Sequence, residues 1–218
     1  MTIKAIIFDF GEVLNRSVDR QEVASRRAEV AARLGVPLDE LWSYLFDRES
    51  SEKWMTGQLT WDEFWTEVLA PHGITDLAEI RDFARWVLPK TERLNPDMVQ
   101  LLGELKGRFS LAILSNATWR EEQMGKMFHN DLELPEDTFD VIVTSSSAGV
   151  VKPHPEIFRR VLAKLGVRPE EAIFTDDMPQ FTAAAASLGI HSHTFTSPAE
   201  FRDYLATFGI VTGKPISD

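Results

Sequence analysis

Short apolar runs alternate with helical patterns through the second half of the chain. The first run opens the sequence at residues 3–8, and four more follow at residues 111–114, 141–143, 172–174 and 190–195. Runs of this length between turn residues are typical of strands buried on both faces, and only the last one alternates with polar residues. Strands that alternate with helices predict βαβ units. We therefore expect an α/β core with a Rossmann-like parallel sheet.

The helices between these runs carry start and stop signals of their own. Asn95-Pro96 predicts an N-cap and a first helical residue, and Gly107 ends that helix. Three more helices follow, namely an apolar stripe at 157–165 closed by Gly166, an alanine-rich segment at 183–186 closed by Gly189, and a helix opened by a capping-box sequence at 197–200.

Residues 15–92 have a different pattern, which is helical throughout. Thr60-Trp61-Asp62-Glu63 is a capping-box sequence, and apolar residues follow at helical spacing up to Leu69. Further helical patterns end at Leu34 and cover residues 38–46 and 77–87, and no strand is predicted here. We expect an α/β core at 1–14 and 93–212, an inserted all-helical cap at 15–92 and a tail at 213–218.

Composition narrows the functional classes. The chain has 23 Lys and Arg against 34 Asp and Glu, a net charge of −11, which disfavours binding to nucleic acid or to an anionic membrane. It has no cysteine, which excludes disulfides, thiolate metal sites and cysteine nucleophiles. No apolar run approaches the roughly 20 residues of a membrane span, and Asp9 interrupts the first run too early for a signal peptide. These features predict a cytoplasmic protein.

Polar residues follow the predicted strands at the points where they end. They are Asp9 after the first strand, Ser115 and Asn116 after the second, Lys152 on the loop after the third, and Asp176 and Asp177 after the fourth. Ligands of open α/β sheets bind at the carboxyl ends of the strands. We therefore expect these side chains to meet at one edge of the sheet.

In this order the four motifs resemble those of the haloacid dehalogenase superfamily, and the resemblance extends over almost the whole chain. Within it the sequence is similar to metal-dependent phosphatases that have a helical cap between the first two motifs. The Gly-x-x-Thr-x-x-Glu-Phe pattern of residues 57–64 is similar to the branch of epoxide-hydrolase-associated and sugar-phosphate phosphatases. One short motif is weak evidence, whereas four in order after predicted strands are strong evidence.

The resemblance implies a catalytic role for three of these residues. Asp9 would be the nucleophile that forms an aspartyl-phosphate, and an ordinary turn aspartate after a strand is an equal alternative for that residue taken alone. Ser115 and Asn116 would bind the phosphoryl group, and a helix starting directly after Ser115 would add N-terminal amides; an N-cap serine is the alternative. Lys152 would compensate the charge between Asp9 and the phosphoryl group.

The resemblance also implies a Mg²⁺ site made of Asp9, the backbone carbonyl of Gly11, Asp176 and Asp177. Oxygen ligands suit Mg²⁺, and adjacent buried carboxylates beside Asp9 would repel one another without a cation. Helix N-capping by one of the two neighbouring acids is the structural alternative.

Gly11 departs from the family pattern, which implies an aspartate two residues after the nucleophile as general acid and base. A backbone carbonyl ligand survives this change, but the proton transfer, typically worth about 10²–10⁴-fold, does not. Either the substrate has a good leaving group, such as an anomeric sugar phosphate or an acyl or aryl phosphate, or a neighbour such as Glu12 supplies the proton.

The leading hypothesis is a Mg²⁺-dependent phosphomonoesterase that hydrolyses a small soluble phosphate ester. One alternative is a 2-haloacid dehalogenase, which needs no metal and which the pair Asp176-Asp177 disfavours. Another is a non-catalytic phosphoryl-binding protein, suggested by Gly11. The sequence leaves open the substrate and the oligomeric state, including a homodimer.

Overall fold

A computed structural model of the chain describes residues 2–17, 20–87 and 92–213. The chain divides into two compact units, one made of residues up to 16 together with those from 93 onward, and the other of residues 17–92. Of the predicted tail, only Gly213 belongs to the described residues.

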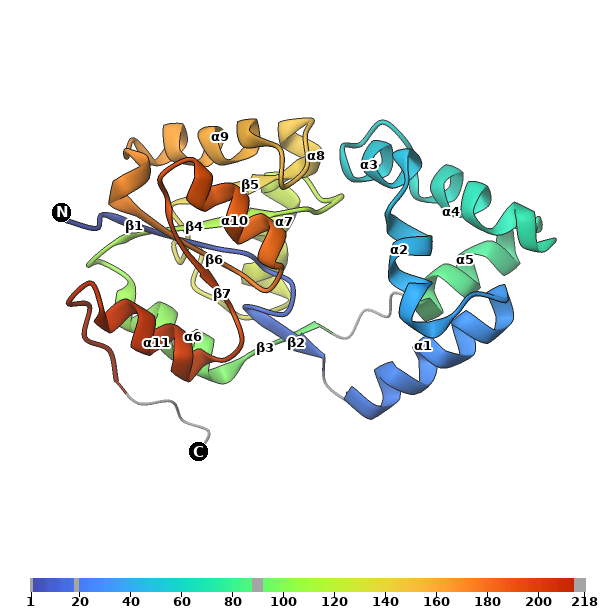
Figure 1. Cartoon of the computed structure of the whole chain (residues 1–218), viewed down its shortest axis with the longest axis horizontal. Helices are drawn as coiled ribbons and strands as arrows, with labels where there is room; N and C mark the ends of the chain where they lie inside the picture. Colours follow the sequence, from blue (N-terminus) through green and yellow to red (C-terminus); the bar gives the residue numbers. More distant parts are fainter. Residues whose placement is uncertain (1, 18–19, 88–91, 214–218) are drawn as a thin grey trace. The chain divides into compact units, whose positions relative to one another are not determined.

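The first unit is built on a five-stranded parallel sheet with the order β5-β4-β1-β6-β7 (Figure 1). Its strands are β1 (Ala5–Phe8), β4 (Ser110–Ser115), β5 (Val141–Thr144), β6 (Ala172–Asp176) and β7 (His191–Thr194). Each coincides with one of the five apolar runs, although β1 starts two residues later than predicted. The α/β fold with a parallel sheet is confirmed.

Helices cover both faces of this sheet. They are α6 (Pro96–Leu105), α7 (Glu121–Asn130), α8 (Ser145–Ala148), α9 (Pro155–Leu165), α10 (Pro179–Ser187) and α11 (Pro198–Ala206), with a short 3₁₀ turn η3 (Pro169–Glu171) before β6. Helices α6, α7 and α11 share an apolar core with Ile6 and Phe8 of β1. Helices α9 and α10 share a second apolar core with Ile7, the residue between those two in the strand. In Figure 1, α9 lies above the sheet and α6 and α11 lie below it. Successive side chains of β1 therefore enter opposite layers, as the lack of polar alternation predicts.

The predicted helix signals of this unit are present in the structure. The side chain of Asn95 accepts a hydrogen bond from the N–H of Asp97 at the start of α6. Helix α9 ends at Gly166, whose φ of 66° is a left-handed conformation that glycine adopts without steric cost. Ser197 caps α11 by accepting from the N–H of Glu200.

The second unit is helical. It contains α1 (Arg20–Leu34), η1 (Leu38–Glu40), α2 (Leu41–Phe46), α3 (Glu49–Met55), α4 (Trp61–Leu69), η2 (Ala70–His72) and α5 (Leu77–Val87). The predicted capping box is present, because Thr60 and Glu63 each accept a backbone N–H from the other. Phe64 and Trp65 of α4 are buried in a core of their own, where Trp54 of α3 stacks on Phe64.

Two short strands contradict the prediction that residues 15–92 hold no strand. Strand β2 (Asn15–Ser17) pairs with β3 (Glu92–Leu94) in a two-stranded sheet, at the places where the chain leaves and re-enters the first unit. Three mostly polar residues are too few for a period of two to be recognised in the sequence. Helix α3 was missed for a similar reason, because only its last two residues are apolar.

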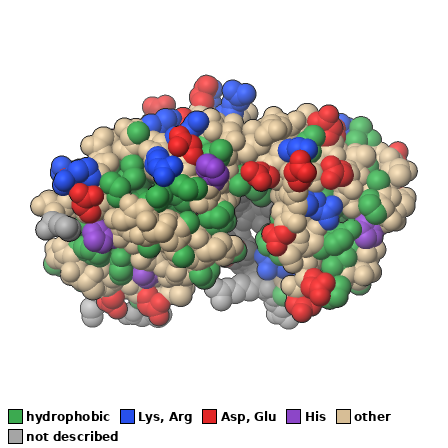
Figure 2. Space-filling view, turned by 45° about the horizontal axis from the view of Figure 1, so that its top comes forward, with side chains coloured by type: hydrophobic (Ala, Val, Ile, Leu, Met, Phe, Trp, Pro, Cys, Tyr) green, Lys and Arg blue, Asp and Glu red, His purple; other side chains and the backbone are tan. Residues whose placement is uncertain are grey.

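Charges of both signs are interspersed on the surface drawn in Figure 2. Several basic groups of the helical unit are paired with acids. Arg33 contacts Glu79, Lys53 contacts Glu49 and Arg81 contacts Asp62. Within the described residues, no helix combines the length and the apolar character that crossing a membrane requires.

Candidate active site at the carboxyl edge of the sheet

Three neighbouring strands bring the predicted residues to one edge of the sheet. Ser115 is the last residue of β4, Asp9 follows β1 directly, and Asp176 is the last residue of β6. The register pairs Phe8 with Ile113 on one side and with Thr175 on the other, so the three strand ends lie next to one another. The ladder continues one step further, because the N–H of Asp9 donates to the carbonyl of Thr175 at 2.9 Å.

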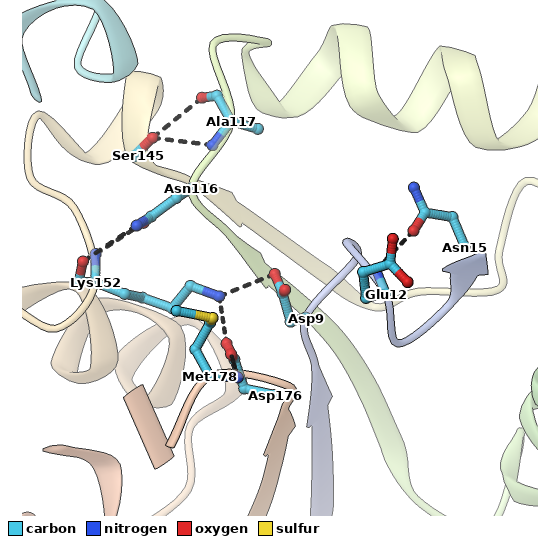
Figure 3. A network of polar contacts seen from close by, with 9 residues as sticks. All are labelled: Asp9, Glu12, Asn15, Asn116, Ala117, Ser145, Lys152, Asp176 and Met178. Atoms are coloured by element: carbon cyan, nitrogen blue, oxygen red, sulfur yellow. Dashed lines mark hydrogen bonds and ion pairs between the residues drawn. The ribbon is translucent and has the colours of Figure 1, made fainter. Parts of the chain in front are cut away.

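Lys152 lies between two of the acids (Figure 3). Its Nζ is 2.9 Å from Oδ1 of Asp9 and 2.6 Å from Oδ2 of Asp176, and its side chain is 1% exposed. Burial alone would lower the pKa of Lys152, but the negative charges of Asp9 and Asp176 outweigh that effect and raise it. The ammonium also lies 5.1 Å from the centre of the Phe181 ring, an additional favourable contact for a cation. Lys152 is therefore a fixed positive charge.

Asp9, Asp176 and Asp177 form an acidic cluster in which one oxygen from each residue lies within 4.8 Å of the others. Burial raises the pKa of Asp176, and the charge of Asp9 adds to this against the opposing ammonium of Lys152. Burial, followed by the charges of Asp9 and Asp176, raises the pKa of Asp177 to about 6. The three carboxylates outnumber the ammonium of Lys152, which contacts Asp9 and Asp176, so negative charge is in excess among these residues when all three are ionised.

This excess of negative charge fits a divalent cation. Carboxylate oxygens are hard ligands of the kind that Mg²⁺ takes. A cation near them would offset burial and the repulsion from Asp9 and Asp176, which together raise the pKa of Asp177. Asp176 is also held in place, since its Oδ1 accepts the N–H of Met178 at 2.9 Å, the residue before α10. The donor set and its charge are therefore compatible with the predicted metal.

Ser115 is buried at the end of β4, with 5% of its surface exposed. The prediction that a helix begins directly after Ser115 is wrong, because α7 starts only at Glu121. The loop at residues 116–120 is held instead by serines of α8. Ser145 Oγ bonds both backbone groups of Ala117, and Ser146 Oγ donates to the carbonyl of Trp119.

The side chain of Asn116, which we predicted to bind substrate, contacts the backbone of Lys152 (Figure 3). Its Oδ1 accepts the N–H of Lys152 at 2.8 Å, and its Nδ2 donates to the carbonyl of the same residue at 3.1 Å. The two residues are 36 positions apart, and neither this pairing nor that of Ser145 with Ala117 has a local signal in the sequence.

At position 11 the backbone does not require glycine. Among the described residues, a Cβ there would meet Oδ2 of Asp9 alone, at the ordinary contact distance of 3.8 Å, and the φ of Gly11 lies outside the left-handed region. The next residue does adopt that region, since Glu12 has a φ of 55° and its N–H donates to Oδ1 of Asn15 at 2.7 Å. In Figure 3, Glu12 and Asn15 lie on the opposite side of Asp9 from Lys152.

Comparison with known families identifies the relatives of this arrangement. Residues 3–189 match the haloacid dehalogenase-like hydrolases. The chain belongs to this family. A curated relative, phosphoserine phosphatase of Thermus thermophilus, is 32% identical over 124 residues, which cover 55% of this chain and 45% of that protein. The chain spans between 9% and 63% of the length of the first curated relatives that it matches.

Solved structures of this hydrolase family share the fold. A family enzyme of Bacteroides thetaiotaomicron, in complex with magnesium and inorganic phosphate, has a TM-score of 0.64 at 22% identity, with 89% of this chain and 94% of that chain covered. A defluorinating L-2-haloacid dehalogenase has a TM-score of 0.60 at 24% identity, with 98% and 89% covered. At these identities the likeness shows the fold alone, so the fold does not discriminate between phosphatase and dehalogenase.

Proposed function

We propose that this haloacid dehalogenase-like hydrolase is a Mg²⁺-dependent phosphomonoesterase that acts on a small organophosphate through an aspartyl-phosphate at Asp9. The observation that carries the proposal is the acidic cluster of Asp9, Asp176 and Asp177, in which the buried Asp9 and Asp176 both contact the ammonium of Lys152. Excess negative charge in a partly buried cluster is unfavourable unless a cation compensates it. Such compensation is expected at a site that holds a divalent cation and an anionic substrate. The 32% identity to a phosphoserine phosphatase agrees with this reaction class.

In this mechanism a carboxylate oxygen of Asp9 attacks the phosphorus, the bond from phosphorus to the leaving oxygen breaks, and an acyl phosphate forms on Asp9. Water then attacks the phosphorus of that intermediate, which releases inorganic phosphate and regenerates the carboxylate. Lys152 orients Asp9 through their 2.9 Å ion pair and stabilises the negative charge of the phosphoryl oxygens. The hydroxyl of Ser115 donates a hydrogen bond to one of those oxygens.

Asp9, Asp176, Asp177 and the backbone carbonyl of Gly11 would hold the Mg²⁺. When bound, the ion neutralises charge on the phosphoryl group. The carboxylates of this chain keep their ionised form beside it, including Asp177, whose pKa is otherwise raised to about 6. We also propose that the inserted helical residues 15–92 serve as the cap that selects the substrate.

Gly11 points to the kind of phosphate ester. No carboxyl group is available at that position to protonate the leaving oxygen, so esters whose leaving group is a weak base should react fastest. An anomeric sugar phosphate or an acyl phosphate belongs to this class. The proposed substrate is therefore a small phosphate with a good leaving group.

The test is a screen of sugar, nucleotide and acyl phosphates for phosphate release, in Mg²⁺ and in EDTA, with wild type and Asp9→Asn. We expect release in Mg²⁺ only, and none from Asp9→Asn. Chloride release from 2-chloropropionate in EDTA, without phosphate release from any ester, would instead establish a dehalogenase. Binding of beryllium fluoride without hydrolysis anywhere in the panel would indicate a non-catalytic phosphoryl-binding protein.

A further inference from the structure

Two loops at the carboxyl edge of the sheet are joined by reciprocal contacts (Figure 3). From the loop after β4, the side chain of Asn116 bonds both the N–H and the carbonyl of Lys152. From the segment after β5, the hydroxyl of Ser145 accepts the N–H of Ala117 at 3.0 Å and donates to its carbonyl at 3.1 Å. Each segment thus contributes one side chain that holds both backbone polar groups of one residue in the other.

The contact from Asn116 defines where the lysine side chain starts. Two parallel hydrogen bonds between an amide side chain and one residue fix both the position and the orientation of that residue's backbone. A lysine side chain has a flexible four-carbon stem, so the placement of its ammonium depends on where the backbone is held. Here the ammonium reaches two carboxylates at once, at 2.9 and 2.6 Å.

The contact from Ser145 secures Asn116 in turn. Ala117 is the next residue along the chain, and Ser147 Oγ accepts the N–H of Glu121 at the end of the same loop. The loop at 116–120 is therefore hydrogen-bonded to α8 at several points, and these bonds hold the backbone next to Asn116 in place. The serines of α8 thus hold the loop that carries Asn116, and Asn116 holds the backbone of Lys152.

We propose that Asn116 is a positioning residue, which holds Lys152 in register between Asp9 and Asp176 and acts on catalysis only through that lysine. The inference rests on the proposed function for its kinetic consequence, and it replaces the substrate-binding role predicted for Asn116 from the sequence. A displacement of the ammonium by about 1 Å is enough to lower turnover about 10²-fold.

A double-mutant cycle separates the two roles kinetically. Asn116→Ala should lower kcat about 10- to 100-fold with little change in KM for the best ester of the screen. In a Lys152→Met background the same substitution should have no further effect, because the residue on which it acts is absent. A rise in KM at constant kcat, or an undiminished effect in the Lys152→Met background, would assign Asn116 to direct substrate contact and overturn the proposal.

Chemical labelling of lysines tests the placement of Lys152 without any turnover. With an amine-reactive acylating reagent and mass spectrometry, Lys152 of the wild type should react far more slowly than Lys4, whose side chain is 56% exposed. Asn116→Ala should accelerate labelling of Lys152 relative to Lys4 several-fold. Asn95→Ala, which removes a side chain that caps α6 in the same unit, is the matched control and should leave this ratio unchanged.

The kinetic cycle and the labelling experiment together distinguish failure of the inference from failure of the proposed function. If the wild type hydrolyses no ester, the proposed function fails, while labelling still decides the role of Asn116. Should Asn116→Ala not fold, Asn116→Ser, which is too short to bond both groups of Lys152, is labelled instead. Unchanged labelling of Lys152 in the folded variant, or equal acceleration in Asn95→Ala, would overturn the proposal.

Discussion

Lys152 and Asp176 form the shorter of the two ion pairs at the site, with 2.6 Å between Nζ and Oδ2 and with side chains that are 1% and 0% exposed. Since both groups are removed from water, each charge depends on the other for its stabilisation. Burial and the charge of Asp9 both raise the pKa of Asp176, and the ammonium of Lys152 opposes them by favouring the ionised carboxylate.

We predict that Lys152→Met destabilises the metal-free protein strongly. Loss of one partner of a buried ion pair typically costs about 3–5 kcal/mol, because the remaining charge stays buried without compensation. Urea denaturation in EDTA, followed by circular dichroism, measures this loss, and Mg²⁺ should restore part of it. Lys126→Met removes an exposed, solvent-screened pair with Glu122 in the same unit and should cost far less. Similar losses in the two variants would contradict the prediction.

A second prediction concerns the pH dependence of stability in EDTA. The pKa of Asp177 is raised from 3.8 to about 6 in the native protein, so the native state holds a proton there that the unfolded chain has already released. The stabilising effect of this proton is complete below about pH 4 and is lost as the pH rises through about 6. Asp177→Asn should therefore melt at a higher temperature than the wild type at pH 7.5, with a smaller difference at pH 4.5.

Mg²⁺ should reverse this order at pH 7.5, because it stabilises the ionised wild-type cluster and finds one ligand fewer in Asp177→Asn. Asp203→Asn, which removes an exposed carboxylate of α11, controls for the change in net charge. A difference in melting temperature between Asp177→Asn and the wild type that is the same at both pH values would show that Asp177 has no raised pKa.

Gly11→Asp should increase activity towards esters with poor leaving groups. The backbone at this position accepts a side chain, and a carboxyl group there would supply the missing proton transfer, worth about 10²-fold or more. Rates with a series of substituted phenyl phosphates measure this, and the dependence on leaving-group basicity should become weaker in the variant. Gly11→Asn, of the same size but without the acid, should show no such gain. A wild-type rate that is insensitive to leaving-group basicity would contradict the missing-acid interpretation.

Thr60→Ala should destabilise the helical unit by about 1 kcal/mol, because the capping box at the start of α4 loses the side chain that accepts the N–H of Glu63. Urea denaturation monitored by tryptophan fluorescence reports mainly on this unit, because five of the six tryptophans, the buried Trp65 among them, lie in residues 17–92. Thr66→Ala changes an exposed threonine inside the same helix and should be neutral or slightly stabilising. Equal losses from both substitutions would assign the effect to the threonine methyl group and not to the cap.

The sequence indicated the edge of the sheet at which the polar residues meet because each of them follows an apolar run, as Asp9 follows β1. The strand order then brings Asp9 between Ser115 and Asp176, and their convergence follows from general rules for parallel sheets. Local capping chemistry was equally readable at Thr60 and Asn95, where the signal lies within three residues.

What the sequence could not reveal depends on contacts between distant segments. Asn116 has the same residue type whether it binds a substrate or the backbone of Lys152, and only the folded loops decide between these roles. The start of α7 at Glu121 was missed because the backbone of the preceding loop is bonded to the serines of α8. Strands β2 and β3 are too short and polar for periodicity to detect.

The central strand β1 pairs Ile6 with Leu111, so all of the helical unit lies between these partners along the chain. During synthesis from the N-terminus, β1 emerges first and remains unpaired while the helical unit, rich in local contacts, folds. A stretch as apolar as Ala5–Phe8 is exposed to aggregation during that interval. Slowing translation between residues 17 and 110 should therefore lower the yield of native protein more than slowing it after β6. By then β1, β4, β5 and β6 have all been made, and β7 emerges beside a sheet that has already begun to form.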